Sequence, residues 1–268
     1  MTKSFIKNLK KLLENKRNIT ILPHKNPDGD AIGSCLALNH FLKKLGHNSN
    51  VISPNDYPDF LNWMPGIKNV LKFSSNKFFC EKLINESDIV FTLDFNSLKR
   101  VEILGDLIKK SKSTVVMIDH HENPEDFSKL TYSDPKIAST CEMTYNVLEK
   151  IKVDEIDWKI ASCLYTGIIT DTGSFKFPST SSRTHLIVSK LLEKGINHTE
   201  IHQNIYDNFK KSRISLLSVT LSNLKILNPI NTVYMTLTQK ELKDNNFKKG
   251  DTEGFVNYGL SIKGVLLS

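Results

Sequence analysis

The chain has 268 residues, of which 39% are hydrophobic and 24% are charged, so it can bury a substantial core and is not a globally disordered chain. Its net charge of +7 mildly favours an anionic partner such as a phosphate ester or a nucleic acid. The four cysteines lack Cys-x-x-Cys spacing, and no apolar run approaches the ~20 residues of a membrane span, so we expect a cytoplasmic protein that does not bind membranes.

Short apolar runs alternate with helical patterns over the first two thirds of the chain. The predicted strands are 19–22, 51–52, 88–94 and 115–118, and the predicted helices that follow the first strand are 31–45, 98–107, 139–151 and 158–169. The β-branched runs 88–94 and 115–118 are typical of strands buried on both faces, as in a parallel sheet. This alternation predicts an α/β fold in which helices flank a parallel sheet.

The pattern changes after Pro178. Helices are predicted at 182–194, 198–209 and 212–227, followed by a strand at 233–237, a helix at 254–262 and a second short strand at 265–267. The stretch 212–227 has leucines and isoleucine at helical spacing and no glycine or proline, so it could connect two lobes. We therefore expect a first domain at 1–195, a helical linker at 196–227 and a small α/β domain at 228–268.

Acidic and imidazole side chains follow the apolar elements in four places. They are His24, Asp28, Asp30, Asp94, Asp119, His120, His121 and Asp171. The carboxyl ends of parallel strands meet at one edge of a sheet, so these side chains should converge on one crevice. Crowded carboxylates repel one another unless cations neutralise them, and carboxylates mixed with histidines suit Mn²⁺, Mg²⁺, Fe²⁺ or Co²⁺. Six likely ligands among these residues are too many for one ion but match two ions that share a bridging carboxylate. Such paired ions are typical of phosphate-ester hydrolysis.

Each of these features also has an ordinary structural interpretation. His24 could be a hydrogen-bonded histidine at a strand end, and Asp28-Gly29-Asp30 could form only a turn. Asp94 and Asp171 could cap helices. Arginines such as Arg100 and Arg183 could bind phosphate, although arginines more often form structural ion pairs. All of these ordinary interpretations would have to hold at once and independently, which is improbable. The sequence therefore favours the metal site.

Four motifs carry a resemblance to a known family. They are H-K-N-P-D-G-D-A-I-G-S at 24–34, L-D at 93–94, D-H-H at 119–121 and T-D-T-G-S-F at 170–175. In this order they resemble the DHH phosphoesterase superfamily and, within it, the bifunctional oligoribonuclease/pAp phosphatases, or nano-RNases. The segment 251–257 looks like a helix of that family's second, DHHA1-like domain. The resemblance implies hydrolysis of short oligoribonucleotides to mononucleotides, or of 3′-phosphoadenosine 5′-phosphate (pAp) to AMP.

The resemblance also implies roles for individual residues. One metal ion would be held by His24, Asp28 and Asp94, and a second by Asp30, Asp94, His120 and Asp171. The ions would be Mn²⁺, with Mg²⁺ or Co²⁺ as alternatives, and Asp94 would bridge them. The expected catalytic residues are Asp94, Asp119, which would orient the adjacent imidazoles, and His121, which would face the scissile phosphate or leaving oxygen. The expected substrate contacts are Ser34, Arg100 and His121, and the chain would act on short RNA or nucleotides as a monomer or homodimer.

One feature departs from the family pattern. Family members carry a Gly-Gly-Gly-His-like substrate loop in the second domain, whereas the 12 glycines of this chain include no adjacent pair. The second domain is therefore expected to be truncated. Alternatives that keep the same metal core are a cyclic-dinucleotide phosphodiesterase, a single-strand exonuclease and an inorganic pyrophosphatase. Two others are an aspartyl-phosphate phosphatase that uses Asp28 and Asp30, and a weakly active or non-catalytic nucleotide-binding homologue.

Overall fold

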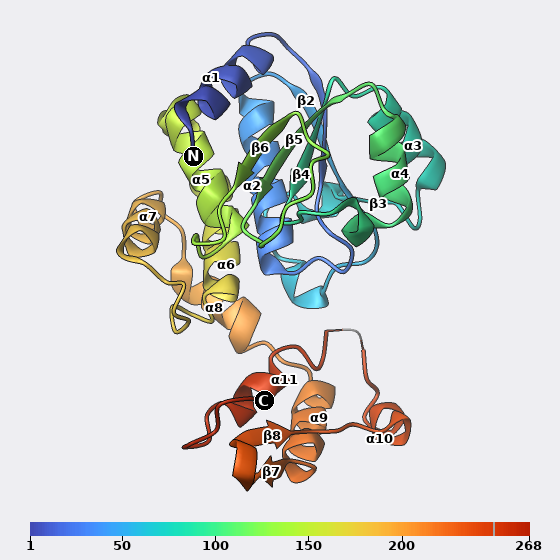
Figure 1. Ribbon diagram of the computed structural model, residues 1–268, viewed down its shortest axis with the longest axis vertical. Coiled ribbons are helices and arrows are strands. Elements are labelled where there is room, and N and C mark those ends of the chain that lie inside the picture. The colour runs from blue at the N-terminus through green and yellow to red at the C-terminus, as the bar shows by residue number, and fades with distance from the viewer. Residues whose placement is uncertain (249) are drawn as a thin grey trace. The chain divides into compact units, whose positions relative to one another are not determined.

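The computed structural model describes residues 1–248 and 250–268, and the chain divides into two compact units (Figure 1). The first comprises Met1–Tyr57 and Leu61–His202, and the second comprises Pro58–Phe60 and Gln203–Ser268. The division falls within helix α8 (His198–Tyr206). In the first unit, the hydroxyl of Tyr165 lies 3.0 Å from Nε2 of His202, the last residue of that unit. Within the described residues, no helix has the length and apolarity needed to cross a bilayer.

The first unit is built on a six-stranded parallel sheet in the order β3-β2-β1-β4-β5-β6. The strands are β1 (Asn18–Leu22), β2 (Asn48–Ser53), β3 (Leu71–Lys72), β4 (Ile89–Leu93), β5 (Thr114–Asp119) and β6 (Leu130–Ser133). The central strand β4 is buried along its whole length and β5 along all but its first residue, because helices cover both faces of the sheet. The predicted α/β class with a parallel sheet is therefore confirmed.

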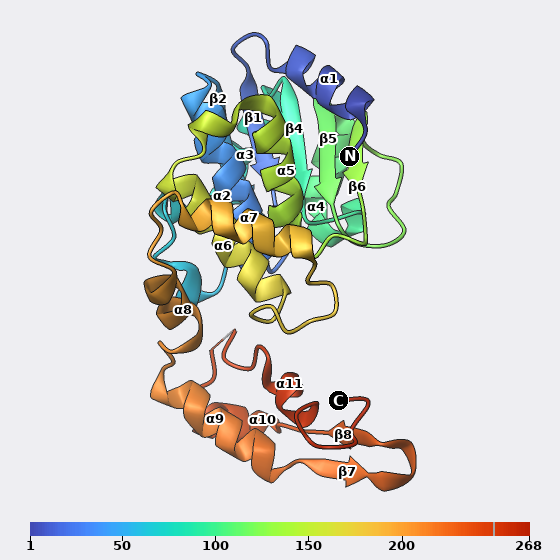
Figure 2. The same ribbon diagram turned by 90° about the vertical axis from the view of Figure 1, so that its left-hand side faces the viewer.

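Helices form a layer on each side of this sheet (Figures 1 and 2). On one side α1 (Lys3–Leu12), α2 (Gly29–Lys44) and α5 (Thr140–Lys152) pack on the sheet, and α6 (Trp158–Asp171) and α7 (Ser182–Leu192) pack against these helices. On the other side lie α3 (Lys77–Asn85) and α4 (Ile103–Lys110). Leu22, Val90 and Val115 point from the sheet into the core beneath α3 and α4. Short 3₁₀ helices lie at Asp59–Leu61, Ile67–Asn69, Leu98–Val101, Val153–Glu155 and Asn228–Ile230.

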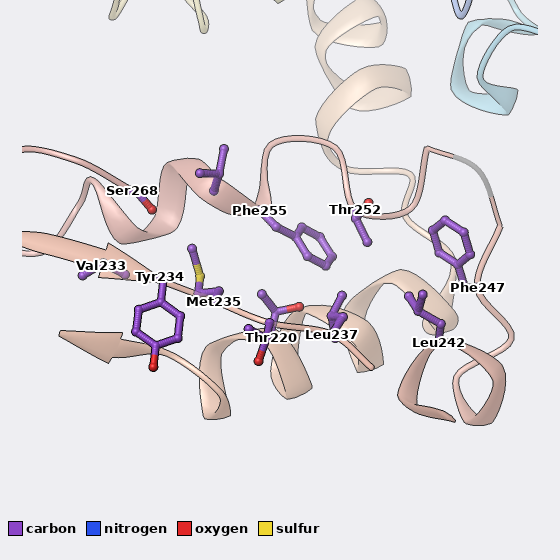
Figure 3. A pocket seen from close by; sticks show the side chains of 12 residues that line it. Thr220, Val233, Tyr234, Met235, Leu237, Leu242, Phe247, Thr252, Phe255 and Ser268 are labelled. Carbon is purple, nitrogen blue, oxygen red and sulfur yellow. The ribbon is translucent and has the colours of Figure 1, made fainter. Parts of the chain in front are cut away.

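The second unit is small and mixes helix with strand. It contains α9 (Lys211–Ser222), α10 (Gln239–Asp244), α11 (Phe255–Gly259) and an antiparallel pair, β7 (Lys225–Leu227) with β8 (Thr232–Tyr234). These elements surround an apolar pocket of about 420 Å³, in which Figure 3 shows Phe255 of α11 and Leu242 of α10. No described side chain that lines this pocket is charged, so it lacks the groups that usually bind phosphate.

Several elements differ from those predicted. The single helix predicted at 212–227 is wrong: α9 ends at Ser222, because the side-chain amide of Asn223 donates to the carbonyl of Thr236 and to Oε1 of Glu241. The helix predicted at 98–107 is broken at Glu102, whose φ of +50° separates a 3₁₀ turn from α4. Strands β3 and β6 were not predicted, because they are short and lie at the two edges of the sheet. Helix α3 was not predicted either.

Helices α2 and α6 pack closely because glycines face each other across their contact. A Cβ on Gly33 would lie 2.6 Å from the carbonyl oxygen of Cys163. A Cβ on Gly167 would lie 2.2 Å from Sγ of Cys141 and 2.7 Å from Oδ1 of Asp30. This close approach brings the start of α2 beside the end of α6, which are the two helix ends that carry acidic side chains.

Replacing Gly167 with alanine should destabilise the fold. The new Cβ must displace Cys141 or Asp30, and overpacking of this kind costs about 1–3 kcal/mol in the free energy of unfolding. Urea unfolding followed by circular dichroism measures the change. Ser189→Ala on the exposed face of α7 is the matched control and should change stability by no more than about 0.5 kcal/mol. Wild-type stability of Gly167→Ala would contradict the close packing described above.

Candidate metal centre

The carboxyl ends of the central strands meet at one edge of the sheet, and the acidic and imidazole side chains gather there. Three groups of side chains each place their ligand atoms within 4.8 Å of one another. They are His24, Asp28 and Asp94; Asp30, His120 and Asp171; and Asp94, His120 and His121. The structure therefore brings together every residue proposed from the sequence as a metal ligand.

Asp94 lies at the centre of this cluster. It follows β4 in a left-handed backbone conformation with φ +65°, which is uncommon for a residue other than glycine and is typical of functional sites. Its Oδ2 lies 3.4 Å from Nε2 of His24, and its Oδ1 lies 3.4 Å from Nε2 of His120. The two oxygens of this buried carboxylate thus face two different groups of potential ligands.

His24 and Asp28 form one side of the cluster. Nδ1 of His24 donates to the carbonyl of Lys25 at 2.8 Å, which leaves Nε2 as the nitrogen that can bind a metal. Asp28 is the N-cap of α2, and its Oδ1 accepts hydrogen bonds from the backbone N–H groups of Asp30 and Ala31. Its other oxygen, Oδ2, lies 3.9 Å from Nε2 of His24. Because capping by Oδ1 fixes the carboxylate, Oδ2 is held in a position where it can bind a metal.

Asp30 lies deeper and is fully buried. Its two carboxylate oxygens accept hydrogen bonds from the backbone N–H groups of Thr140 at 2.6 Å and Cys141 at 2.8 Å, which begin α5. The positive end of the α5 dipole therefore faces this carboxylate. These donors hold both oxygens in place against the neighbouring acids.

His120 and Asp171 complete the cluster. Nε2 of His120 lies 3.2 Å from Oδ2 of Asp171, the last residue of α6. Nδ1 of His120 lies 3.3 Å from the carbonyl oxygen of Ile137, which orients the ring. We expected Asp119 to orient both adjacent imidazoles, but His120 is oriented by this carbonyl instead.

Of the two adjacent histidines, Asp119 orients only His121. The buried carboxylate accepts a hydrogen bond from the backbone N–H of His121 at 2.9 Å and another from its Nδ1 at 2.7 Å. The His121 side chain is 37% exposed, so it lies at the open side of the cluster. Because Nδ1 is engaged by Asp119, Nε2 is the ring nitrogen available to a bound molecule.

The expected substrate contacts have different surroundings. Nη1 of Arg100 donates to the backbone carbonyl of Asp94 at 3.5 Å, so this guanidinium lies beside the cluster. Ser34 is fully buried inside α2, and its hydroxyl donates to the carbonyl of Ala31 at 3.1 Å. This placement does not support the expected contact between Ser34 and a substrate. Arg183 forms an ion pair with Glu149 at 2.9 Å, in line with its structural interpretation.

Thr140 supports the cluster but was not predicted from the sequence to do so. Its hydroxyl donates to Oδ1 of Asp94 at 2.9 Å, while its backbone N–H binds Asp30. The stretch Ser139-Thr140-Cys141-Glu142 was interpreted only as the start of a helix, and Ser139 does cap α5 by accepting from the N–H of Glu142. A helix-start signature gives no indication that the first N–H groups bind a distant carboxylate.

Crowding of like charges perturbs the acid–base behaviour of these groups. Burial, together with the charges of Asp171 and Asp94, raises the pKa of Asp30, and burial raises the pKa of Asp171 to about 6. Burial alone would lower the pKa of His120, but hydrogen bonds to Asp171 and Asp94 outweigh it and raise this pKa to about 12. Burial would raise the pKa of Asp94, but hydrogen bonds from His120 and His24 lower it. An imidazolium thus supplies positive charge where a metal ion would fit.

The donor set fits divalent metal ions. It consists of carboxylate oxygens and imidazole nitrogens, which suit Mn²⁺, Mg²⁺ and related ions. The buried carboxylate of Asp94 serves two of the groups, so two ions could share it. The helix N-terminus at Asp30 and the carbonyls at His24 and His120 provide the supporting contacts that metal ligands commonly have.

Binding of a divalent ion should release protons at neutral pH. The pKa of about 12 keeps His120 protonated in the ion-free protein, and an imidazole nitrogen must lose its proton to bind a metal. The apparent affinity should therefore rise with pH, by up to about tenfold per unit for each proton released. Calorimetric titrations of Mn²⁺ in two buffers with different ionisation enthalpies measure the proton count, and identical enthalpies in the two buffers would contradict this prediction.

Comparisons with a family profile and with solved structures find proteins similar to this chain. The profile described as "DHH family, N-terminal domain" matches residues 18–168. A crystal structure of a Bacteroides fragilis protein, described as exopolyphosphatase-related, is 41% identical with a TM-score of 0.95 and covers 99% of this chain and 79% of its own.

Curated relatives include enzymes named for different substrates. The bifunctional oligoribonuclease and PAP phosphatase NrnA of Thermus thermophilus is 33% identical over 68% of this chain and 52% of its own length. The cyclic-di-AMP phosphodiesterase GdpP of Bacillus subtilis is 30% identical over 70% of this chain and 29% of its own length. The chain spans 52% to 59% of the length of the first relatives it matches. Since the family profile covers more than half of its residues, the chain belongs to the DHH family.

Proposed function

We propose that this chain is a two-metal phosphoesterase that releases mononucleotides from short oligoribonucleotides and phosphate from pAp. The observation that carries the proposal is the position of Asp94, whose two oxygens lie 3.4 Å from nitrogens of two different histidines. The similarity to NrnA supports the choice of substrates. The donor set supports divalent ions, of which we propose Mn²⁺.

The cluster divides into two proposed ligand sets. The first is His24, Asp28 and Asp94, and the second is Asp30, Asp94, His120 and Asp171. When bound, paired divalent ions lower the pKa of a water to supply a nucleophile and offset negative charge on a phosphoryl group. Neighbouring groups hold these ligands in place. The hydroxyl of Thr140 donates to one oxygen of Asp94, and the N–H groups at the start of α5 donate to both oxygens of Asp30.

His121 is the proposed proton donor to the leaving oxygen. Its Nδ1 donates to buried Asp119, so Nε2 is directed away from that carboxylate and can meet a substrate at the exposed side of the cluster. The hydrogen bond to Asp119 also fixes the orientation of the ring. Arg100 beside Asp94 is proposed to bind a substrate phosphate, because its guanidinium is positioned at the same edge of the sheet.

A cyclic-dinucleotide phosphodiesterase is the second candidate. The observation that favours it is the 30% identity with GdpP over 70% of this chain. The aspartyl-phosphate alternative finds less support, because both oxygens of Asp30 accept backbone hydrogen bonds within the fold. It would also leave the hydrogen-bonded pair of Asp119 and His121 without a role.

A side-by-side assay with Mn²⁺ tests the proposal. We expect hydrolysis of pAp and of a dinucleotide and a 5-mer RNA, with slower turnover of a cyclic dinucleotide and of pyrophosphate. Asp94→Asn should abolish turnover and lower the number of bound Mn²⁺ ions, because it removes the shared charge while asparagine tolerates the left-handed backbone. Fastest turnover of the cyclic dinucleotide would favour the alternative, and no turnover by Mn²⁺-loaded protein would overturn the proposal.

His121→Ala separates proton donation from metal binding. We expect kcat for pAp to fall roughly 10²–10⁴-fold while the bound Mn²⁺ content is unchanged, because the side chain acts on the leaving group. His198→Ala, at an exposed position at the start of α8, is the matched control and should leave kcat unchanged. Unaltered kcat in His121→Ala would remove this residue from the mechanism, and lost metal would make it a ligand.

A further inference from the structure

A second pocket lies in the first unit and is separate from the metal cluster. Its volume is about 550 Å³, which is within the usual range of small-molecule sites. Its lining includes His40 of α2, Trp158 and Ser162 of α6, and Trp63 and Asn69 of the loop that follows β2. The start of α8 closes one side with Asn197 and Glu200.

The helices place this pocket far from the metal cluster. Asp30 and His40 are ten residues apart on α2, which corresponds to ~15 Å along the helix axis. Trp158 begins α6 and Asp171 ends it, which corresponds to ~20 Å. The pocket is therefore formed by the ends of α2 and α6 that lie opposite the metal cluster, and it is not part of that site.

Aromatic side chains form much of the pocket. The chain has two tryptophans, and both line it. Trp158 is 52% exposed, which is unusual for so large an apolar side chain, and Nζ of Lys159 lies 5.6 Å from the centroid of its ring. An exposed indole beside a cation is suited to stacking a heteroaromatic ring that is linked to a phosphate group.

Polar groups in the pocket have hydrogen-bonding capacity to spare. Ser162 lies one turn after Trp158 on α6 and is 6% exposed. The indole N–H of Trp63 is also buried, without a partner in 1–248 or 250–268. Nε2 of His40 donates to the carbonyl of Pro65 at 2.9 Å, which leaves Nδ1 of the neutral ring as an acceptor. The lining of the pocket therefore includes polar side chains that can hydrogen-bond to a bound molecule as well as apolar surface.

We propose that this pocket binds the base of a nucleotide, with the base stacked on Trp158 and the phosphate near Lys159. Two indole side chains, polar lining groups and the Lys159 cation match the chemistry of a nucleobase with its phosphate. The base could come from a free mononucleotide or from an oligonucleotide, and the test separates the two. The site does not depend on the proposed hydrolysis, because none of the proposed metal ligands lines it.

Tryptophan fluorescence, excited selectively over tyrosine, reports on this site, because both tryptophans of the chain line the pocket. AMP and adenosine can be titrated into the Mn²⁺-loaded protein, since the proposed chemistry does not consume them, and a 5-mer RNA can be titrated in EDTA. We expect saturable quenching by AMP and weaker binding of adenosine, which lacks the phosphate. Quenching by RNA alone would assign the pocket to an oligonucleotide base. An unchanged spectrum with all three up to millimolar concentration would overturn the proposal.

Substitutions at the pocket locate the effect. Trp158→Ala leaves Trp63 as the reporter and should abolish binding, and Ser162→Ala should weaken it about 3- to 10-fold. Lys159→Met should weaken binding of AMP but not of adenosine, while Lys150→Met, an exposed lysine on α5, should affect neither. Equal affinity of wild type, Trp158→Ala and Lys159→Met for AMP would refute the site. A protein without hydrolytic activity that still shows these changes would refute only the proposed function.

Discussion

Crowding of negative charge at one edge of the sheet is the constraint on which the rest of the site depends. Asp28, Asp30, Asp94 and Asp171 approach one another where three strands and two helices end, and like charges held away from water repel strongly. In the absence of an ion, the fold offsets this repulsion by holding a proton on His120 and by directing N–H groups at Asp30. Divalent cations would offset the repulsion between these carboxylates more effectively. The cluster is therefore suited to binding metal ions.

Close helix packing keeps these charges in place. Asp30 belongs to α2, accepts hydrogen bonds from the start of α5, and lies so near Gly167 of α6 that a Cβ there would be 2.7 Å from Oδ1. One carboxylate is therefore fixed by three helices. A repulsive cluster needs such support, because a site on mobile loops would relax by moving its charges apart.

The sequence predicted the strand ends and their acidic residues because apolar β-branched runs end abruptly at Asp94 and Asp119. It could not predict the carbonyl of Ile137 or the N–H groups of Thr140 and Cys141, because backbone groups leave no signature of residue type. The resemblance implies a substrate contact for Ser34, but a serine inside a helix can bond to a preceding carbonyl and remain enclosed. The prediction of one helix over 212–227 was wrong because short apolar segments fit a strand equally well.

The metal cluster and substrate choice are separable properties of this fold. The family profile ends at residue 168, yet it already includes all the clustered acids and imidazoles except Asp171. Relatives named for oligoribonucleotides, for pAp and for cyclic-di-AMP all match this chain over about 70% of its residues. A core shared by enzymes with different named substrates provides phosphoester chemistry but cannot itself discriminate among nucleotides. Discrimination must therefore come from groups other than the metal ligands, namely those that contact the base or distal phosphates.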